Sequence, residues 1–246
     1  MASIKTPKGR LKYKPKNLYL GIKQINREVA FENLRILISL LQEFGIRVSP
    51  AYGTLLGIIR ENNFIEWDED IDLFILNEDK EKFLNSLWAM KEQGLDLVRV
   101  DRCGHLYSVM RNGEYIDFYI MDRLSPEIRT EYGNLFMLEK YLVDLIDYDF
   151  RGITVSVPRE YEQCLELLYG DWRTPVKYAN FNLNRLQIAR ANLRSFLKSI
   201  LPPPVHLFLL KRHHLKDLKK FLSKCRSKGV TLCYDVNYLG IIKVKQ

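Results

Sequence analysis

The sequence predicts an α+β fold, with a mixed β-sheet flanked by helices and a helical extension at the C-terminus. Three observations lead to this prediction. Several segments repeat apolar residues at helical spacing, and others are short apolar runs bounded by turn residues. A triple proline at 202–204 then separates a last, basic helical segment from the rest. With 246 residues and 47% hydrophobic content, the chain is long enough to bury a sizeable core.

The first half of the chain alternates between helical and extended patterns. Apolar residues recur at every third or fourth position before Gly45, which stands where a helix C-terminal cap belongs. Gly53 and Thr54 indicate a turn that opens a short helix, and Gly94 ends an amphipathic segment behind Asn77. The predicted elements are a helix over 25–44, a strand over 46–52, a helix over 55–61, a strand over 71–76 and a helix over 78–91.

The second half is richer in strands. Asn112 and Gly113 are a strong signal for a type I′ hairpin turn, and Arg151 and Gly152 separate a second pair of strand-like runs. Pro158 is placed to start a helix that continues through residue 169. The other predicted elements are strands over 95–100, 105–111, 114–121, 143–150 and 153–157, helices over 184–201 and 205–228, and a strand-like tail over 230–236.

Charge is segregated along the chain, whose formal net charge is +8. Residues 1–23 carry +7 and residues 194–246 carry +10, so the middle carries 8 − 17 = −9. The basic ends are either solvated surface or contacts for anionic lipid or a phosphate-bearing partner. This pattern divides the chain into a basic N-terminal segment (1–24), a central domain (25–201) and a basic C-terminal helix and tail (202–246).

Membrane-spanning, secreted and zinc-binding classes are not favoured. There is no run of about 18 uncharged apolar residues, and the first 16 residues alternate lysines with polar residues instead of forming a signal peptide. The four cysteines include no CxxC pair, so neither a zinc site nor a disulfide framework is expected. We expect a cytoplasmic protein with reduced cysteines.

Three aspartates indicate a metal site. Asp70 and Asp72 alternate at the start of a predicted strand, so both side chains lie on one face. Repulsion between two such carboxylates calls for a hard cation with oxygen ligands, which predicts Mg²⁺, with Mn²⁺ as a substitute. Asp117 lies inside another strand among apolar residues, where a charge needs a partner or a metal. If the two strands are adjacent, Asp117 completes a three-carboxylate cluster suited to phosphoryl chemistry.

The residues before the acids suit a phosphate. Gly53 allows close approach of the backbone, Thr54 offers a hydroxyl, and the helix that follows offers free N–H groups. Tyr52 and Trp67 are placed to form an aromatic wall for a cationic group of a ligand, or alternatively to pack in the core. Together these features predict a site for the phosphates of a nucleotide diphosphate.

At this point the residues resemble a known family. Gly-Thr opening a helix, an alternating acid pair and a third acid on a later strand resemble the polymerase-β-type nucleotidyltransferase fold. The longer string YGTLLGIIRENNFIEWDEDID (52–72) resembles the signature of the LicD/fukutin family. A second patch, VPREYEQCLELLYGDWRTP (157–175), is similar to that family's downstream element, and the resemblance spans roughly residues 28–178. One departure is Ile65-Glu66, where the family often has isoleucine and proline.

The resemblance implies a catalytic domain over 25–201 that transfers a phospho-alcohol, such as phosphocholine, ribitol phosphate or glycerol phosphate. The donor would be CDP-linked, the acceptor a sugar hydroxyl of a surface glycan or glycolipid, and CMP the product. By residue matching, Asp70 and Asp72 would hold Mg²⁺, and Asp117 would be a third ligand or the base for the sugar hydroxyl. Arg60 would add positive charge beside the donor phosphates. Such a role fits polysaccharide, lipopolysaccharide or capsule modification.

Two other functions stay open. The same fold could transfer a nucleotide from an NTP to RNA, protein or a small molecule, although the basic ends lack the interleaved aromatic residues of a single-strand nucleic-acid platform. A non-catalytic scaffold is the third reading, but its acid set should be broken, and here all three acids are present.

The basic helix over 205–228 has two interpretations. Its broad apolar stripe opposite several lysines suits a helix lying in a membrane interface near anionic headgroups, which would place the protein at the inner face of the membrane. The same pattern suits a helix docked on the domain with its lysines in water.

Overall fold

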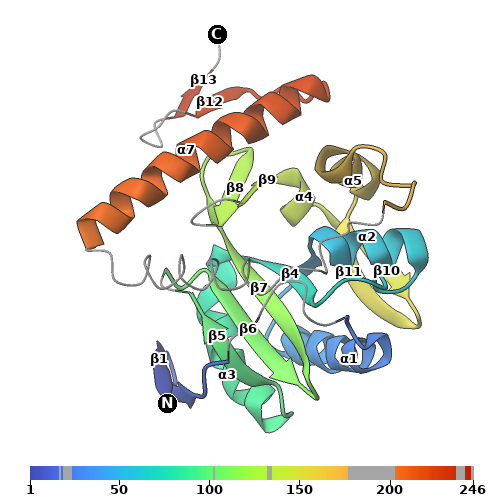
Figure 1. Cartoon of the computed structure of the whole chain (residues 1–246), viewed down its shortest axis with the longest axis vertical. Coiled ribbons are helices and arrows are strands. Elements are labelled where there is room, and N and C mark those ends of the chain that lie inside the picture. The colour runs from blue at the N-terminus through green and yellow to red at the C-terminus, as the bar shows by residue number, and fades with distance from the viewer. Residues whose placement is uncertain are drawn as a thin grey trace, which may run out of the picture.

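The computed structural model describes residues 1–16, 18, 24–101, 103–131, 135–176, 203–236 and 242–244. Its centre is a seven-stranded mixed sheet with the order β3–β4–β7–β6–β5, while β8 pairs with β7 and β9 (Figure 1). β4 and β7 run parallel, and the other pairs are antiparallel. The strands are β3 (Ser49–Pro50), β4 (Ile71–Leu76), β5 (Asp96–Val100), β6 (Leu106–Arg111), β7 (Glu114–Arg123), β8 (Ile128–Glu131) and β9 (Leu135–Leu138).

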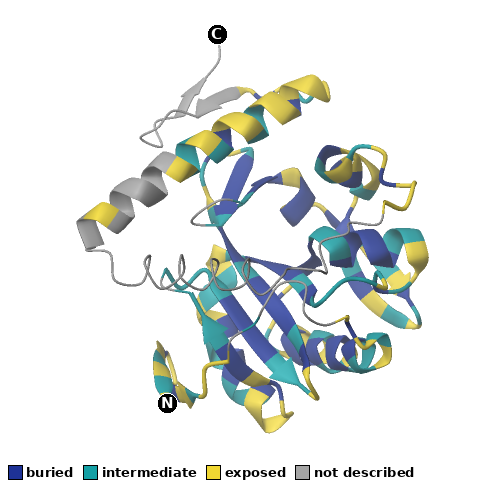
Figure 2. Cartoon of the chain, in the orientation of Figure 1, coloured by how far each residue is buried: buried dark blue, intermediate teal, exposed yellow. Residues whose placement is uncertain are grey.

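Two helices cover one face of this sheet. In α1 (Arg27–Glu43) the buried leucines recur at helical spacing, and the Asn26 side chain caps the first turn by accepting from the Val29 N–H. α3 (Lys80–Glu92) follows the short 3₁₀ turn η1 (Asn77–Asp79), and its Phe83 ring packs 4.8 Å from the ring centroid of Phe118 on β7. The strands under these helices are largely buried, as the dark blue strands in Figure 2 show.

The opposite face carries α2 (Tyr52–Glu61), with α5 (Tyr161–Tyr169) packed on it, whereas the hairpin of β10 (Leu145–Phe150) and β11 (Ile153–Pro158) lies beside β3 at the edge of the sheet and also contacts α1. α2 packs on both β4 and α5. The residues between the hairpin strands, Arg151 and Gly152, have φ values of 54° and 86°, as a type I′ turn requires. Asn112 and Gly113 have 53° and 85°, so both predicted hairpin turns are confirmed.

Most predicted elements are present, and two boundaries are corrected. The strand predicted over 46–52 is reduced to Ser49–Pro50, because α2 begins at Tyr52 and not at residue 55. Pro158 ends β11 and does not start a helix; α5 begins three residues later, at Tyr161. In both cases a long-range strand pairing decides where the local pattern ends.

Several short elements were not predicted. β1 (Ala2–Thr6) and β2 (Gly9–Tyr13) form a hairpin within the basic N-terminal segment, and α4 (Lys140–Val143) follows β9. β8 and β9 have only four residues each, too few for a clear alternation. The helix predicted over 184–201 lies outside the described residues.

The C-terminal helix α7 (Pro203–Ser227) lies beside β8 and β9, at the far end of the molecule from α1 and α3 (Figure 1). Leu218 and Cys225 are buried, and the ring centroids of Phe136 on β9 and Phe221 lie 5.9 Å apart. The Lys224 ammonium donates to the Leu168 carbonyl of α5 at 2.8 Å. The later part of the helix is therefore docked on the domain, as one of the two interpretations predicted. Beyond it, β12 (Tyr234–Val236) pairs with β13 (Ile242–Val244).

Among the helices that the structure describes, none combines the length and the apolar character needed to cross a membrane. None of the four cysteines forms a disulfide in the structure.

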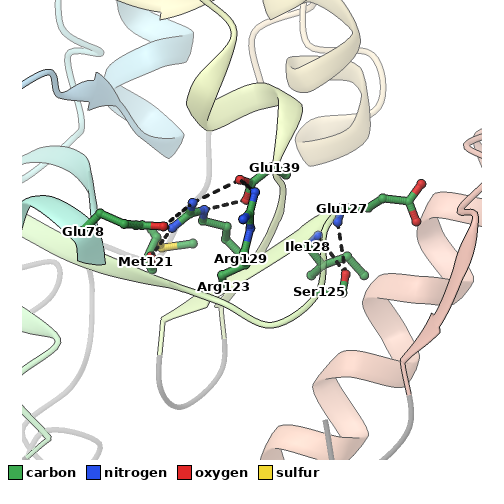
Figure 3. Close-up of polar contacts among 8 residues, drawn as sticks. All are labelled: Glu78, Met121, Arg123, Ser125, Glu127, Ile128, Arg129 and Glu139. Carbon is green, nitrogen blue, oxygen red and sulfur yellow. Dashed lines mark hydrogen bonds and ion pairs between the residues drawn. The ribbon is translucent and has the colours of Figure 1, made fainter. Parts of the chain in front are cut away.

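A buried ion-pair network holds β8 in place (Figure 3). The Arg129 side chain is only 3% exposed and forms paired hydrogen bonds with Glu78 after β4 and with Glu139 after β9. It also donates to the Met121 carbonyl at 3.1 Å. Arg123 reaches the same Glu139 carboxylate at 2.8 Å from a side chain that is 58% exposed. One guanidinium therefore ties the end of β4 to the strands on which α7 docks.

Candidate active site

Strand pairing brings the three aspartates together. β4 and β7 are adjacent and parallel, and their register places Asp72 directly opposite Asp117. Asp70 lies two residues before Asp72 and so shares its face. One carboxylate oxygen from each residue lies within 4.8 Å of the other two. The predicted adjacency of the two strands is thus confirmed, and the acids form one cluster.

Withdrawal from water and mutual repulsion dominate the electrostatics of this cluster. Burial, followed by the charges of Asp70 and Asp117, raises the pKa of Asp72 well above its usual range. Burial and the Asp117 charge raise the pKa of Asp70 to about 8. Burial alone is the main cause that raises the pKa of the neighbouring Asp68 to about 6. Without a counter-cation, the cluster therefore holds protons that ordinary aspartates release near pH 4.

The donor set fits a divalent cation. Oδ1 of Asp72 and Oδ1 of Asp117 are both buried and have no hydrogen-bond partner among the residues that the structure describes. Buried carboxylate oxygens without donors are rare unless an ion or water satisfies them. Three converging oxygens from three carboxylates are the ligands that Mg²⁺ and Mn²⁺ take.

A cation from the protein already lies in the cluster. The Arg99 guanidinium on β5 pairs through Nη2 with Asp117 Oδ2, and its Nε donates to Ser108 Oγ at 2.8 Å. Burial raises the pKa of Asp117, and the Arg99 charge counteracts that rise. Arg99 was not among the predicted site residues, because nothing in its local sequence shows that β5 lies two strands from Asp117.

Thr54 has a different position from the one predicted. It is buried, it does not line the cleft described below, and its hydroxyl accepts a hydrogen bond of 2.8 Å from the Asp72 N–H. The Ala51 N–H in turn donates to the Asp72 carbonyl at 2.9 Å. The start of α2 therefore fixes the backbone of Asp72 on both sides, and the Thr54 hydroxyl is engaged by that backbone instead of lining the cleft.

Gly53 faces the cleft, but Asp68 occupies the space beside it. A Cβ atom at this position would lie 2.2 Å from Asp68 Oδ2. The other oxygen of Asp68 accepts from the Glu69 N–H at 3.2 Å. A side chain at this position would therefore have to displace the carboxylate of Asp68, a reason for glycine that the sequence pattern did not reveal.

We expect Gly53→Ala to impair activity more than stability. The new methyl group displaces the Asp68 carboxylate beside the acid cluster, and a displacement of this size typically lowers turnover by about tenfold or more, whereas the loss of folding free energy should stay near 1 kcal/mol. Gly57→Ala is the matched comparison on the same helix, since its Cβ would meet the Asn63 carbonyl oxygen at 2.6 Å. Chemical denaturation and steady-state kinetics of both variants separate the two effects. A Gly53→Ala protein with normal turnover would contradict this assignment.

A cleft of about 760 Å³ opens over the cluster. Tyr169 and Trp172, from the second sequence patch, lie in its wall. Tyr115 and Tyr119, which alternate with Asp117 on β7, were missed although that alternation could have revealed them. Of the predicted site residues, those that line the cleft are Tyr52, Gly53, Arg60, Trp67, Asp70, Asp72 and Asp117.

Two of these residues are constrained by their neighbours. Tyr52 has a φ of 44°, in the left-handed region that an aromatic residue rarely adopts, and its ring packs edge-on against Phe74 and Tyr119 at 5.3 and 5.8 Å. Arg60 donates to the Trp172 carbonyl at 3.2 Å and pairs with Glu61 at 2.7 Å. Its guanidinium therefore ties α2 to the segment after α5 on one wall of the cleft.

The family model described as LicD/FKTN/FKRP, nucleotidyltransferase domain, matches residues 45–160. This segment contains α2, β4 and β7, and with them all three aspartates. Residues 45–160 are therefore similar to a LicD-type nucleotidyltransferase domain. The resemblance of the glycine-turn and WDEDID string to that family is thereby confirmed, and so is the expectation of a mixed sheet flanked by helices.

Two relatives are each 27% identical to this chain over the residues that match. The uncharacterized protein RT0683 of Rickettsia typhi matches over 169 residues, 67% of this chain and 52% of that protein. Ribitol 5-phosphate transferase FKRP of Homo sapiens matches over 161 residues, 56% of this chain and 30% of FKRP. The chain thus spans about half or less of the length of these relatives.

Among solved structures, the chain is similar to two antibiotic-modifying enzymes. The lincosamide antibiotic adenylyltransferase LnuA has a TM-score of 0.41 at 13% identity, with 67% of this chain and 96% of LnuA covered. ANT(2″)-Ia in complex with adenylyl-2″-tobramycin has a TM-score of 0.43 at 11% identity, with 79% and 99% covered.

Proposed function

We propose that this chain transfers a phospho-alcohol from a CDP-linked donor to a sugar hydroxyl of a glycan or glycolipid, with Mg²⁺ and with release of CMP. Ribitol phosphate, glycerol phosphate and phosphocholine are the candidate groups. The observation that supports this most is the convergence of Asp70, Asp72 and Asp117 at the floor of one cleft, within the segment that matches the family. FKRP, by its name a ribitol 5-phosphate transferase, is the relative that supports the chemical class.

Asp70, Asp72 and Asp117 would hold Mg²⁺, because each offers an oxygen to a common point and two of these side chains have a buried oxygen without a donor. When bound, the ion would neutralise charge on the phosphoryl group in transfer and on the departing CMP. The protein's own contribution is positional. Thr54 and Ala51 fix the backbone of Asp72, and the parallel pairing of β4 with β7 fixes the distance to Asp117.

The cleft walls would hold the donor and the acceptor. Arg60 lines the same cleft as the acids and would bring positive charge toward the donor phosphates. Tyr52 and Trp67 would supply aromatic surface for the donor, and Tyr169 and Trp172, which also line the cleft, would offer aromatic surface to a sugar ring. The packing of Tyr52 against Phe74 and Tyr119 supplies apolar surface beside the acids, which would help to keep water from the transferred group.

The test is a comparison of released products. Purified protein is incubated with Mg²⁺ and, separately, with CDP-ribitol, CDP-glycerol, CDP-choline and the four NTPs, with CMP and pyrophosphate followed by chromatography. We expect CMP from at least one CDP-alcohol, at a rate that falls to background with EDTA and recovers with Mg²⁺ or Mn²⁺. Pyrophosphate from an NTP, without CMP from any CDP-alcohol, would overturn the phosphotransferase in favour of nucleotidyl transfer. No product from any donor, despite measurable Mg²⁺ binding, would favour a scaffold.

A further inference from the structure

Arg99 reaches the acid cluster because of an irregularity in β5. The pairing of β5 with β6 runs from Leu97 opposite Val109 to Arg99 opposite Ser108, so one additional residue, Val98, is inserted on β5. In a regular ladder Val98 would stand opposite Ser108 and Arg99 would face the apolar side of the sheet. The bulge instead places the guanidinium on the side of the aspartates.

The result is a row of polar residues across four strands. Arg99 on β5 lies opposite Ser108 on β6, Ser108 lies opposite Asp117 on β7, and Asp117 lies opposite Asp72 on β4. Ser108 and Asp117 are buried, whereas the Arg99 side chain is 32% exposed and lines the cleft. Arg99 is therefore the member of the row that extends from the sheet into the space above the acids.

Much of the guanidinium is free to bind. Nε is used by Ser108 and one N–H of Nη2 by Asp117, and within the described part of the chain no other hydrogen bond is formed by this side chain. Arginine has five N–H donors in a planar fork, so both N–H groups of Nη1 and the second of Nη2 are available to a ligand in the cleft. A pair of such donors matches two oxygens of a phosphate.

We propose, building on the function proposed above, that Arg99 is a phosphate-binding residue of the transfer site. It keeps Asp117 in the cluster with one N–H and binds a phosphate oxygen of the diphosphate donor with the others. The alternative is a counter-ion that only neutralises Asp117. The two roles differ in what happens to anion binding when the fork is removed and the charge is kept.

The test uses three variants and two probes that involve no turnover. Arg99→Met removes the charge and the fork, Arg99→Lys keeps the charge without the fork, and Arg159→Met is the matched control, an exposed arginine paired with Asp144. Isothermal titration calorimetry measures binding of Mg²⁺ and then of inorganic pyrophosphate at saturating Mg²⁺. Thermal unfolding with and without Mg²⁺ confirms that each variant is folded.

Opposite changes in the two affinities are expected for Arg99→Met. Loss of a positive charge beside three carboxylates should tighten Mg²⁺ binding by about tenfold, while pyrophosphate binding should weaken by about tenfold or more. Arg99→Lys should bind Mg²⁺ like the wild type and pyrophosphate several-fold more weakly. Arg159→Met should match the wild type in both titrations.

Two other results would contradict a phosphate-binding role for Arg99. Wild-type affinity for pyrophosphate in either Arg99→Met or Arg99→Lys would reduce Arg99 to a counter-ion and overturn the proposal while leaving the proposed function intact. A wild-type protein that binds neither Mg²⁺ nor pyrophosphate would overturn the proposed function, and this proposal with it.

Discussion

Asp72→Asn should abolish turnover and at the same time make the metal-free protein more stable. Asparagine fills the same space but removes one of three carboxylates that converge within 4.8 Å. Loss of a charged group that stabilises the transferred phosphoryl group should reduce turnover by about 100-fold or more. In the metal-free protein the same change removes repulsion and an ionisable group whose pKa burial raises well above its usual range.

Two measurements test this pair of effects. Differential scanning calorimetry without metal should show a Tm for Asp72→Asn that is higher by at least about 3 °C, and Mg²⁺ should raise the Tm of the wild type only. Asp147→Asn on β10 is the matched control, because that carboxylate is 74% exposed and outside the cleft. A folded Asp72→Asn protein with full turnover would rule out the metal assignment.

The pH dependence of stability gives a further check of the same cluster. The pKa of Asp70 rises from its ordinary value of 3.8 to about 8 in the folded, metal-free protein. Between these values the folded state binds more protons than the unfolded state, so its free energy of unfolding should fall as the pH increases toward 8. Saturating Mg²⁺ should remove most of that fall, since it replaces the protons. Denaturant titrations at pH 5, 6.5 and 8, with and without Mg²⁺, measure this, and a metal-free protein with equal stability at all three would contradict it.

Arg129→Met should destabilise the fold more than any change in the cleft. The arginine is 3% exposed, and its removal leaves the Glu139 carboxylate, itself 10% exposed, without its buried partner (Figure 3). Breaking a buried pair from one side costs about 3–5 kcal/mol of unfolding free energy. The lost contacts also free the end of β4 and the strands that support α7. Urea denaturation monitored by circular dichroism measures the loss.

The neighbouring Arg123 is the internal control. It pairs with the same Glu139 carboxylate, but its side chain is 58% exposed, so Arg123→Met should cost less than about 1 kcal/mol. Adding Glu139→Gln to Arg129→Met should recover part of the stability, because no uncompensated charge is then left inside. Equal losses of unfolding free energy in Arg129→Met and Arg123→Met would show that burial of the ion pair does not determine its contribution to stability.

The sequence predicted the structure correctly where a functional feature follows from the local residue pattern of one strand or turn. The alternation of Asp70 and Asp72 predicted two carboxylates on one face, and Asn112-Gly113 predicted the hairpin that returns β7 to the sheet beside β6. Prediction from the sequence failed where the orientation of a side chain depends on pairing with a strand distant in the chain, as for the bulge that places Arg99 on the cleft side of the sheet. Thr54 shows the same limit: its residue type suits a phosphate, but its hydroxyl accepts from the Asp72 N–H, 18 residues along the chain.

The acid pair, the third acid inside a strand and the family resemblance of the surrounding string could all be predicted from residues that are contiguous in the chain. Three features depend on contacts between distant segments: Asp72 stands opposite Asp117, Asp68 occupies the space beside Gly53, and Arg99 joins the cluster. A strand's period fixes which face a side chain is on, whereas register and bulges, set by pairing across the sheet, fix which side chains meet.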